Sequence, residues 1–304
     1  MIELTESEYR EYTKDIENEE VEEILFSILE KINIKLCFIE NYINDDEELE
    51  ILKINFFKIF FKQFNTIIIL LSKTKYKYNL KFEYTDIKSI YILIRSVHEL
   101  YLTFQYIFNS KYFNVSKEEE TNFKYLLYKY CGEKDNIKAF HNKKNITGLN
   151  DEQEQALVKY EKASEKMFSL ISSNKIYHTL SKTIKKKIQN GISWKINKEK
   201  ELTWTELLEN TYMSTEYGKG YYAVLCQYSH TTYNSITLEL NHNYDKLGVL
   251  YHLSLITSLI VKEYINISFD GNIVKITEDD IISKRELSLI VEFITMSISG
   301  YFKK

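Results

Sequence analysis

His230 is a candidate catalytic residue in the segment of residues 221–234. In this segment mixed aromatic and aliphatic residues are followed by Ser229-His230-Thr-Thr. The apolar part predicts a helix, and Ser and Thr are residue types that cap a helix end or hydrogen-bond a ligand. Because imidazole titrates close to neutral pH, His230 at such a break could be a general base or a phosphate ligand. The alternative is a histidine that is hydrogen-bonded to backbone at a helix junction.

A second polar group lies in the segment Arg95-Ser-Val-His98-Glu99. Arg95 and Glu99 have the i, i+4 spacing and His98 has the i, i+3 spacing, so the side chains can approach one another on a helix. The surrounding residues are apolar, and a charge in such surroundings must be paired because burial without a partner is costly. Two interpretations remain open: a structural Arg–Glu pair that fixes helix register, and a polar site that opens into a pocket.

The elements that must position these residues are expected to be helices. The chain of 304 residues has no proline and eight glycines, so the residues that most effectively interrupt helices are nearly absent. Apolar residues recur at steps of three and four, which predicts amphipathic helices. We expect these helices at residues 21–43, 47–73, 86–109, 151–172, 175–189, 219–228, 232–240, 247–265 and 278–299.

Local signals refine this pattern. Capping boxes at Ser116 with Glu119 and at Thr203 with Glu206 predict the starts of two shorter helices, and Gly132 predicts the end of the first. The polar segment 133–149 is expected to be a surface loop. Asp270-Gly271 could form a tight turn between two short strands.

The expected fold is therefore all-α. We predict a multi-helix bundle with at most one small β-hairpin, built from residues 1–304 as a single helical domain. Residues 15–75 form an N-terminal helical hairpin within it.

Composition restricts the function classes. The net charge of −4 provides no global field for nucleic acid, so any nucleic-acid site must be local. The three cysteines have no CxxC or zinc-type spacing, which favours reduced thiols in a cytoplasmic protein and no metal site or cofactor. The N-terminal segment is unlike a signal peptide. Residues 247–261 are uncharged but too short to span a bilayer comfortably, Lys58 and Lys62 interrupt the apolar stretch of residues 56–71, and no membrane span is expected. Walker A, GxGxxG, HExxH and GxSxG motifs are absent.

Residues 84–240 carry a set of short motifs. They are the Arg95-x3-Glu99 helix, Trp194, the segment Thr203-Trp204-Thr205-Glu206, and Tyr222-x2-Leu-x3-Ser229-His230. In these motifs the chain resembles an uncharacterised bacterial all-helical family that looks related to the HEPN superfamily. The resemblance implies a HEPN-like core over residues 84–300.

The resemblance also implies a function. Many proteins of that group belong to antiphage (antiviral) defence or toxin systems, and many are dimeric, metal-independent endoribonucleases. Their usual motif places an arginine and a histidine on one helix, and His230 matches that histidine. No arginine lies between Arg95 and Arg285, so only Arg95 could replace the motif's arginine, and only if folding brings the two segments together.

The leading expectation is thus a bacterial defence or toxin protein that binds nucleotide or RNA, with ribonuclease activity as its catalytic form. His230 would be the base, Arg95 the phosphate stabiliser and Glu99 the group that orients Arg95. Further ligand-binding residues are expected to be His98, Ser229, Tyr228, Thr231 and Asn234. The alternative is a non-enzymatic protein-interaction or sensor module in which the Arg/Glu/His cluster is structural. A homodimer is expected by analogy with the superfamily.

Overall fold

The computed structural model describes residues 48–71, 74–76, 79–211, 213–241, 249, 252–253, 255–257 and 259–260. These residues form helices and one two-stranded hairpin, so the all-α class predicted from the sequence is confirmed. Contacts between Cα atoms divide the chain into two compact units. The first unit comprises residues 1–102 and 211–304, and the second comprises residues 103–210.

The first unit contains helices α3 (Glu48–Leu71), α4 (Ile87–Phe104, whose last two residues belong to the second unit), α10 (Thr215–Ser229) and α11 (Tyr233–Asn241). Between α3 and α4 the strands β1 (Thr74–Tyr76) and β2 (Asn79–Tyr84) pair antiparallel. The predicted hairpin at Asp270-Gly271 and the predicted helices 21–43 and 278–299 lie outside the described residues.

Helices α3 and α4 supply much of the described core of the first unit. On α3 the buried apolar side chains are Ile54, Phe56, Phe57, Phe60, Phe64, Ile67 and Leu71. On α4 those with no exposure at all include Ile90, Ile94, Val97 and Tyr101. The amide Nε2 of Gln63 donates to Ser96 Oγ at 2.7 Å, so a polar contact joins the two helices beside this core.

Helix α3 is the one described helix that is long and apolar enough to cross a membrane. Its most apolar window has a mean hydropathy of 1.4, and 39% of that window is buried inside the structure. Length and composition alone are weak evidence for a span, because the core helix of a soluble protein has the same properties.

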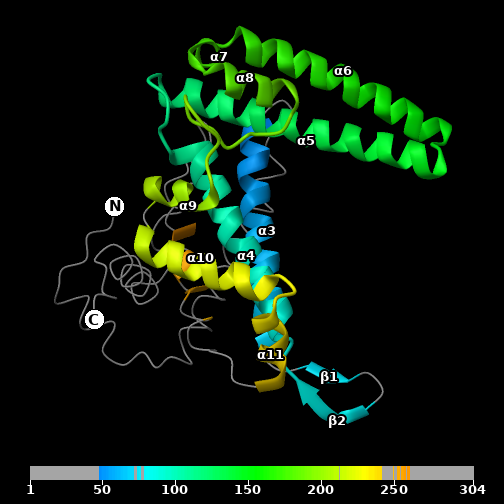
Figure 1. The fold of residues 1–304 in the computed structure, drawn as a ribbon, viewed down its shortest axis with the longest axis vertical. Helices are drawn as coiled ribbons and strands as arrows, with labels where there is room; N and C mark the ends of the chain where they lie inside the picture. The colour runs from blue at the N-terminus through cyan, green and yellow to red at the C-terminus, as the bar shows by residue number, and fades with distance from the viewer. Residues whose placement is uncertain are drawn as a thin grey trace, which may run out of the picture. The chain divides into compact units, whose positions relative to one another are not determined.

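The second unit is built around a long helical hairpin. Helices α5 (Lys117–Thr147) and α6 (Asp151–Ser173) lie side by side (Figure 1). They are followed by the short helices α7 (Lys175–Thr179), α8 (Lys182–Gln189) and α9 (Trp204–Leu207). The unit also includes a π-helical turn, η1 (Gln105–Asn109), and a 3₁₀ turn, η2 (Leu208–Asn210).

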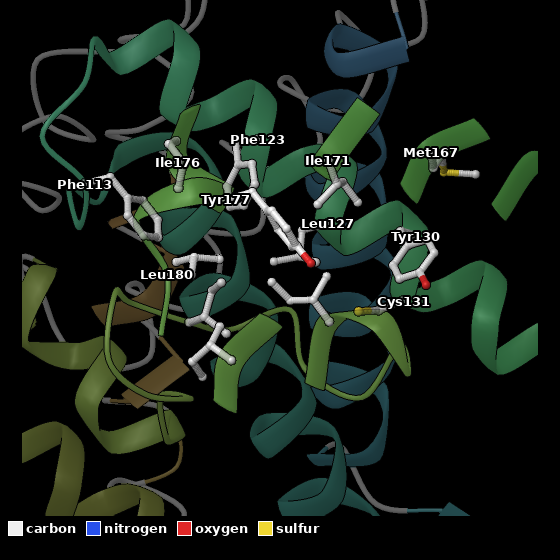
Figure 2. Close-up of a cluster of buried hydrophobic side chains, with 13 residues drawn as sticks. Phe113, Phe123, Leu127, Tyr130, Cys131, Met167, Ile171, Ile176, Tyr177 and Leu180 are labelled. Carbon is white, nitrogen blue, oxygen red and sulfur yellow. The ribbon is translucent and has the colours of Figure 1, made fainter. Parts of the chain in front are cut away.

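The core of the second unit is a continuous cluster of buried apolar side chains. Figure 2 shows this cluster, in which side chains from α5, α6, α7 and α8 meet. Leu127 and Ile171, on the facing sides of the α5–α6 hairpin, and Ile188 of α8 have no exposed surface. Packing of this kind, rather than helix propensity alone, stabilises such amphipathic helices.

The predicted loop at residues 133–149 is wrong, because α5 continues through Gly132 to Thr147. A glycine inside a helix costs about 1 kcal/mol relative to alanine. Contacts with α6 stabilise the extended part: the Phe140 and Tyr160 rings lie 5.7 Å apart, and Lys144 pairs with Glu154 at 2.8 Å. The glycine that ends the helix is Gly148, whose φ of 77° suits a residue without a Cβ.

The single helix predicted at residues 175–189 is two helices in the structure. The first ends at Leu180, whose backbone is extended, and the side chain of Ser181 caps the second by accepting from the Ile184 N–H. By contrast, the predicted capping box of Thr203 and Glu206 is confirmed, with both of its hydrogen bonds present. At Ser116 the side chain accepts from the Glu119 N–H.

Candidate functional site

One face of α4 lies against the C-terminal part of α10 and the break that follows it. Lys88, Tyr91, Arg95 and Glu99 repeat at steps of three or four and therefore share this face. The Tyr91 ring stacks on Tyr228 at 4.9 Å. Arg95 reaches Ser229 and His230, and Glu99 reaches Tyr222, as described below.

Arg95 is the centre of the polar contacts. Its Nε donates to Glu99 Oε1 at 2.9 Å, and its Nη1 donates to Ser229 Oγ at 3.1 Å. The same Nη1 lies 2.9 Å from Nε2 of His230. Two segments that are 135 residues apart in sequence thus meet at one guanidinium group. The second terminal nitrogen, Nη2, makes no hydrogen bond to the residues that the structure describes, so the guanidinium has donors left for a ligand.

Glu99 holds the guanidinium in place. Its Oε1 also accepts a hydrogen bond from the Tyr222 hydroxyl at 2.7 Å, and the Arg95 guanidinium carbon lies 5.7 Å from the Tyr222 ring centroid. Partial burial opposes the charge of Arg95, but the hydrogen bond and the charge of Glu99 outweigh it, so the pKa of Arg95 is raised. Burial, followed by the neighbouring Glu99 carboxylate, raises the pKa of Tyr222. Arg95 is therefore a fixed cation and Tyr222 a fixed donor.

His230 is positioned by the break between α10 and α11. It is the C-cap residue of α10, with extended backbone and its N–H directed to the Cys226 carbonyl. Beyond it, Thr232 Oγ1 accepts from the Ser235 N–H at 3.2 Å while Ser235 Oγ accepts from the Thr232 N–H at 3.1 Å. This reciprocal pair starts α11 and fixes the direction in which the chain leaves His230.

The contact with Arg95 defines the form of the His230 ring. A guanidinium group can only donate, so Nε2 of His230 is the acceptor and carries no proton in this contact. In a neutral ring the proton is then on Nδ1. The one lone pair that could take a proton from a substrate is directed at Arg95.

Solvent reaches part of the cluster. The Arg95 and Glu99 side chains are 24% and 26% exposed, and His230 is exposed. A group of this kind is held by the protein and can still be reached by a ligand.

His98 has different partners from Arg95 and His230. It is fully buried, its Nδ1 lies 3.1 Å from Nε2 of His252, and its ring stacks on Tyr222 at 5.4 Å. On the other side of His252, Nδ1 is 2.9 Å from the Tyr217 hydroxyl. Burial lowers the pKa of His98 to about 3, and burial together with His98 lowers the pKa of His252. Both rings are therefore neutral near pH 7 and form a sealed layer beneath Tyr222.

The structure distributes the remaining predicted ligand-binding residues around the break. Tyr228 is partly buried against Tyr91, and Thr231 is exposed and accepts from Lys88 Nζ at 3.3 Å. Asn234 is exposed in the first turn of α11. Of the predicted residues, Arg95, Glu99, Ser229 and His230 come together directly, and Thr231 lies next to them in the chain.

Lys88 and Tyr222 belong to the site in the structure but are not among the site residues expected from the sequence. Lys88 brings a second cation to the break through Thr231, and Tyr222 holds Glu99. A signal for Lys88 was present, because it lies two helical turns before Arg95 on the same face. For Tyr222 the signal was its place in the Tyr-x2-Leu-x3-Ser-His motif.

The described residues were also compared with the pattern of a metal site. No group of three or more His, Cys, Asp or Glu side chains that could hold a metal ion occurs among the described residues.

A scan against protein-family models, a search of curated proteins and a search of solved structures each give no match to the chain. The resemblance to the HEPN superfamily therefore remains an expectation from the motifs.

Proposed function

We propose that the cluster of Arg95, Glu99, Ser229 and His230 binds a phosphate group of RNA or of a nucleotide, and that His230 cleaves RNA there without a metal ion. The observation that carries the proposal is the 2.9 Å contact between Arg95 Nη1 and His230 Nε2 in a cluster that is partly exposed to solvent. A phosphate stabiliser and a proton acceptor within one hydrogen bond of each other are the minimum that this chemistry needs.

The binding step uses the guanidinium. Arg95 keeps its charge, and Glu99 fixes its orientation. Nη2 of Arg95 makes no hydrogen bond to the described residues. Arginine binds phosphate oxygens through two adjacent N–H groups. A phosphate that accepts from Nη1 and Nη2 would replace His230 as the acceptor on Nη1, which releases the Nε2 lone pair. Lys88, at the same break, adds a second positive charge for the RNA backbone.

The cleavage step then balances as follows. His230 Nε2 takes the proton of a ribose 2′-hydroxyl, and the 2′-oxygen attacks the adjacent phosphorus. The bond from phosphorus to the 5′-oxygen breaks, water protonates the leaving oxygen, and the hydroxide that remains takes the proton back from His230. The products are a 2′,3′-cyclic phosphate and a 5′-hydroxyl end. Arg95 stabilises the negative charge that develops on the phosphorane oxygens.

Incubation of end-labelled RNA with the protein in excess chelator tests the cleavage step. We expect fragments with cyclic-phosphate ends from the unchanged protein and a loss of about 10²-fold or more in rate for His230→Gln. His178→Gln is the matched control, because His178 is an exposed histidine of α7 outside the cluster. Equal fragments from the His230 and His178 variants, or no fragments from the unchanged protein, would count against catalysis.

One observation favours a second candidate function. The polar groups of the cluster already pair with one another, since Arg95 pairs with Glu99 and occupies the His230 lone pair. A non-enzymatic protein-interaction or sensor module, with the cluster as a structural element, accounts for this mutual pairing. It predicts that Arg95→Ala lowers the melting temperature by many degrees, and that a nucleotide raises it without turnover if the module is a sensor.

The setting of the activity rests on the motif resemblance. We propose a bacterial defence or toxin protein that acts in the cytoplasm as a homodimer. Light scattering on the purified protein tests the dimer, with twice the chain mass of 36.4 kDa as the expected value. A mass of one chain at the concentration of the cleavage assay contradicts it.

A further inference from the structure

A cavity in the second unit is separate from the Arg95 cluster. Its volume is about 560 Å³, and it lies between α5 and the segment of residues 190–194 that follows α8. The α5 residues that line it include Cys131, Lys134, Lys138 and His141, which recur at steps of three and four. One face of the helix is therefore presented to the cavity over nearly three turns.

The opposite wall is held rigidly. Gly191 has a φ of 65°, and the N–H groups of Gly191 and Ile192 bond back to the carbonyls of Ile188 and Lys187, which is the Schellman end of α8. The Tyr130 hydroxyl donates to the Gln189 carbonyl at 2.9 Å and ties this end to α5. A Cβ at Gly191 would lie 2.3 Å from Cγ of Lys134, so the stem of that lysine rests directly on the turn.

Part of the lining is apolar and accessible. Ile192 is 63% exposed, although it belongs to a turn that is fixed by hydrogen bonds. Beside it, Trp194 is partly buried and is held by edge contacts with Tyr128 at 5.0 Å and Tyr106 at 5.7 Å. An isoleucine left open beside a fixed indole is surface that a flat apolar ring would cover.

Polar side chains form much of the rest of the lining, and among the charged ones two lysines face one aspartate. Among the described residues, no carboxylate lies within ion-pair distance of Lys134 or Lys138, and the Lys134 ammonium sits 5.7 Å from the Tyr130 ring centroid. Asp135 also lines the cavity, and His141 contacts Glu161 at 3.5 Å. Asn142 and Asn190 add neutral hydrogen-bonding groups. Two ammonium groups that have no carboxylate partner among the described residues, against one lining carboxylate, favour an anion.

We infer that this cavity binds a small organic anion that carries a flat apolar ring. Its volume falls within the range of about 300–1,000 Å³ that is usual for small-molecule sites. The ring lies against Ile192 and Trp194, and the anionic group is held by Lys134 and Lys138. Asp135 accepts a hydrogen bond from a hydroxyl or amino group of the ligand.

Calorimetric titration with two matched pairs of probes tests the inference. Each pair has the same ring with and without a negative charge: AMP with adenosine, and nicotinate with nicotinamide. We expect at least one anion to bind about tenfold or more tightly than its neutral partner, the discrimination of one charge-assisted contact. The double substitution Lys134→Met/Lys138→Met removes both charges and keeps the lysine stem on Gly191, and it should abolish this preference.

Two further variants locate the site. Lys182→Met/Lys186→Met removes two exposed lysines of α8 that do not line the cavity and should leave binding unchanged. Arg95→Gln should also leave it unchanged, which separates the cavity from the proposed phosphate site. The two tryptophans, Trp194 and Trp204, both lie in the second unit. In a Trp204→Phe background, quenching of Trp194 therefore reports occupancy directly.

The inference is overturned if neither anion binds or if the neutral partners bind equally well. It is also overturned if the α5 lysine variant binds like the α8 control, or if Arg95→Gln alone abolishes binding. Tighter binding of an anion that is lost only in the α5 variant, with quenching of Trp194, supports it.

Discussion

Two ion pairs with the same helical spacing differ in their surroundings. Arg95 and Glu99 on α4 are about one-quarter exposed, whereas Lys124 and Glu120 on α5 are 0% and 3% exposed. Lys124 donates to the Ser110 carbonyl at 2.7 Å and lies over the Tyr106 ring, 4.7 Å from its centroid. The i, i+4 spacing alone therefore does not distinguish a structural pair from a site.

The partners of the carboxylates make the same distinction. Glu120 accepts from the backbone N–H groups of Tyr112 and Phe113, at 2.7 and 3.2 Å, and so fixes the chain before α5. Glu99 accepts from Arg95 and Tyr222 at an edge that solvent reaches. The sealed pair, Lys124 with Glu120, stabilises the chain before α5. The open pair, Arg95 with Glu99, positions a guanidinium that still has N–H donors for a ligand.

The largest expected effect is on the sealed pair. Lys124→Met leaves Glu120 buried without its cation, which typically costs about 3–5 kcal/mol. Chemical denaturation should show this loss in the free energy of unfolding. The double variant Glu120→Gln/Lys124→Met should be less destabilised than the sum of the single changes, because the two groups interact. Strict additivity would show that the pair does not act as a unit.

The buried histidines next to the open pair predict a pH effect of intermediate size. The pKa of His98 in the folded state is about 3, well below its ordinary value of 6.5. Below pH 6.5 the unfolded chain takes up a proton that the folded chain refuses, so stability is lost as the pH falls toward 3. The free energy of unfolding then falls by at most about 1.4 kcal/mol per pH unit for each such histidine.

His98→Phe keeps a ring against Tyr222 and removes one titrating group. Thermal unfolding from pH 7 to pH 5 should show a shallower decrease in stability for His98→Phe than for the unchanged chain. His178→Gln, which removes an exposed histidine, is the control and should leave the slope unchanged. Parallel curves for the unchanged chain and His98→Phe would contradict a buried neutral His98.

The smallest expected effect is on the stability contribution of the open pair. Arg95→Met should cost less than about 1 kcal/mol, since ion pairs that solvent reaches contribute little and Glu99 keeps solvent and the Tyr222 hydroxyl as partners. Denaturation of this variant beside Lys124→Met measures the contrast. A loss as large as that of Lys124→Met would assign Arg95 to the structural class and favour the non-enzymatic module.

The sequence was sufficient for the elements that periodicity and caps define. Residues 47–73 were predicted as a helix and form α3 over Glu48–Leu71, because their apolar face is continuous. It was insufficient at Gly132, where a lone glycine looks like a helix end and the later contacts with α6 decide otherwise. Local signals cannot reveal such tertiary support.

The candidate site shows the same limit. Residue types singled out Arg95, Glu99, Ser229 and His230, and the structure brings these together. His98 cannot be separated from them by sequence, since a histidine at i+3 can face either the cluster or the core. In the structure, its position in the sealed layer depends on His252, which is 154 residues away.

The central claim is that the open pair on α4 is a phosphate site. The most direct measurement is the affinity of the unchanged protein and of Arg95→Gln for an RNA oligomer with 2′-O-methyl groups, which cannot be cleaved, at one fixed salt concentration. We expect Arg95→Gln to bind about tenfold or more weakly, the loss of one charge-assisted contact, with an almost unchanged melting temperature. Equal affinity of the two proteins, or weaker binding that accompanies a large drop in melting temperature, would contradict it.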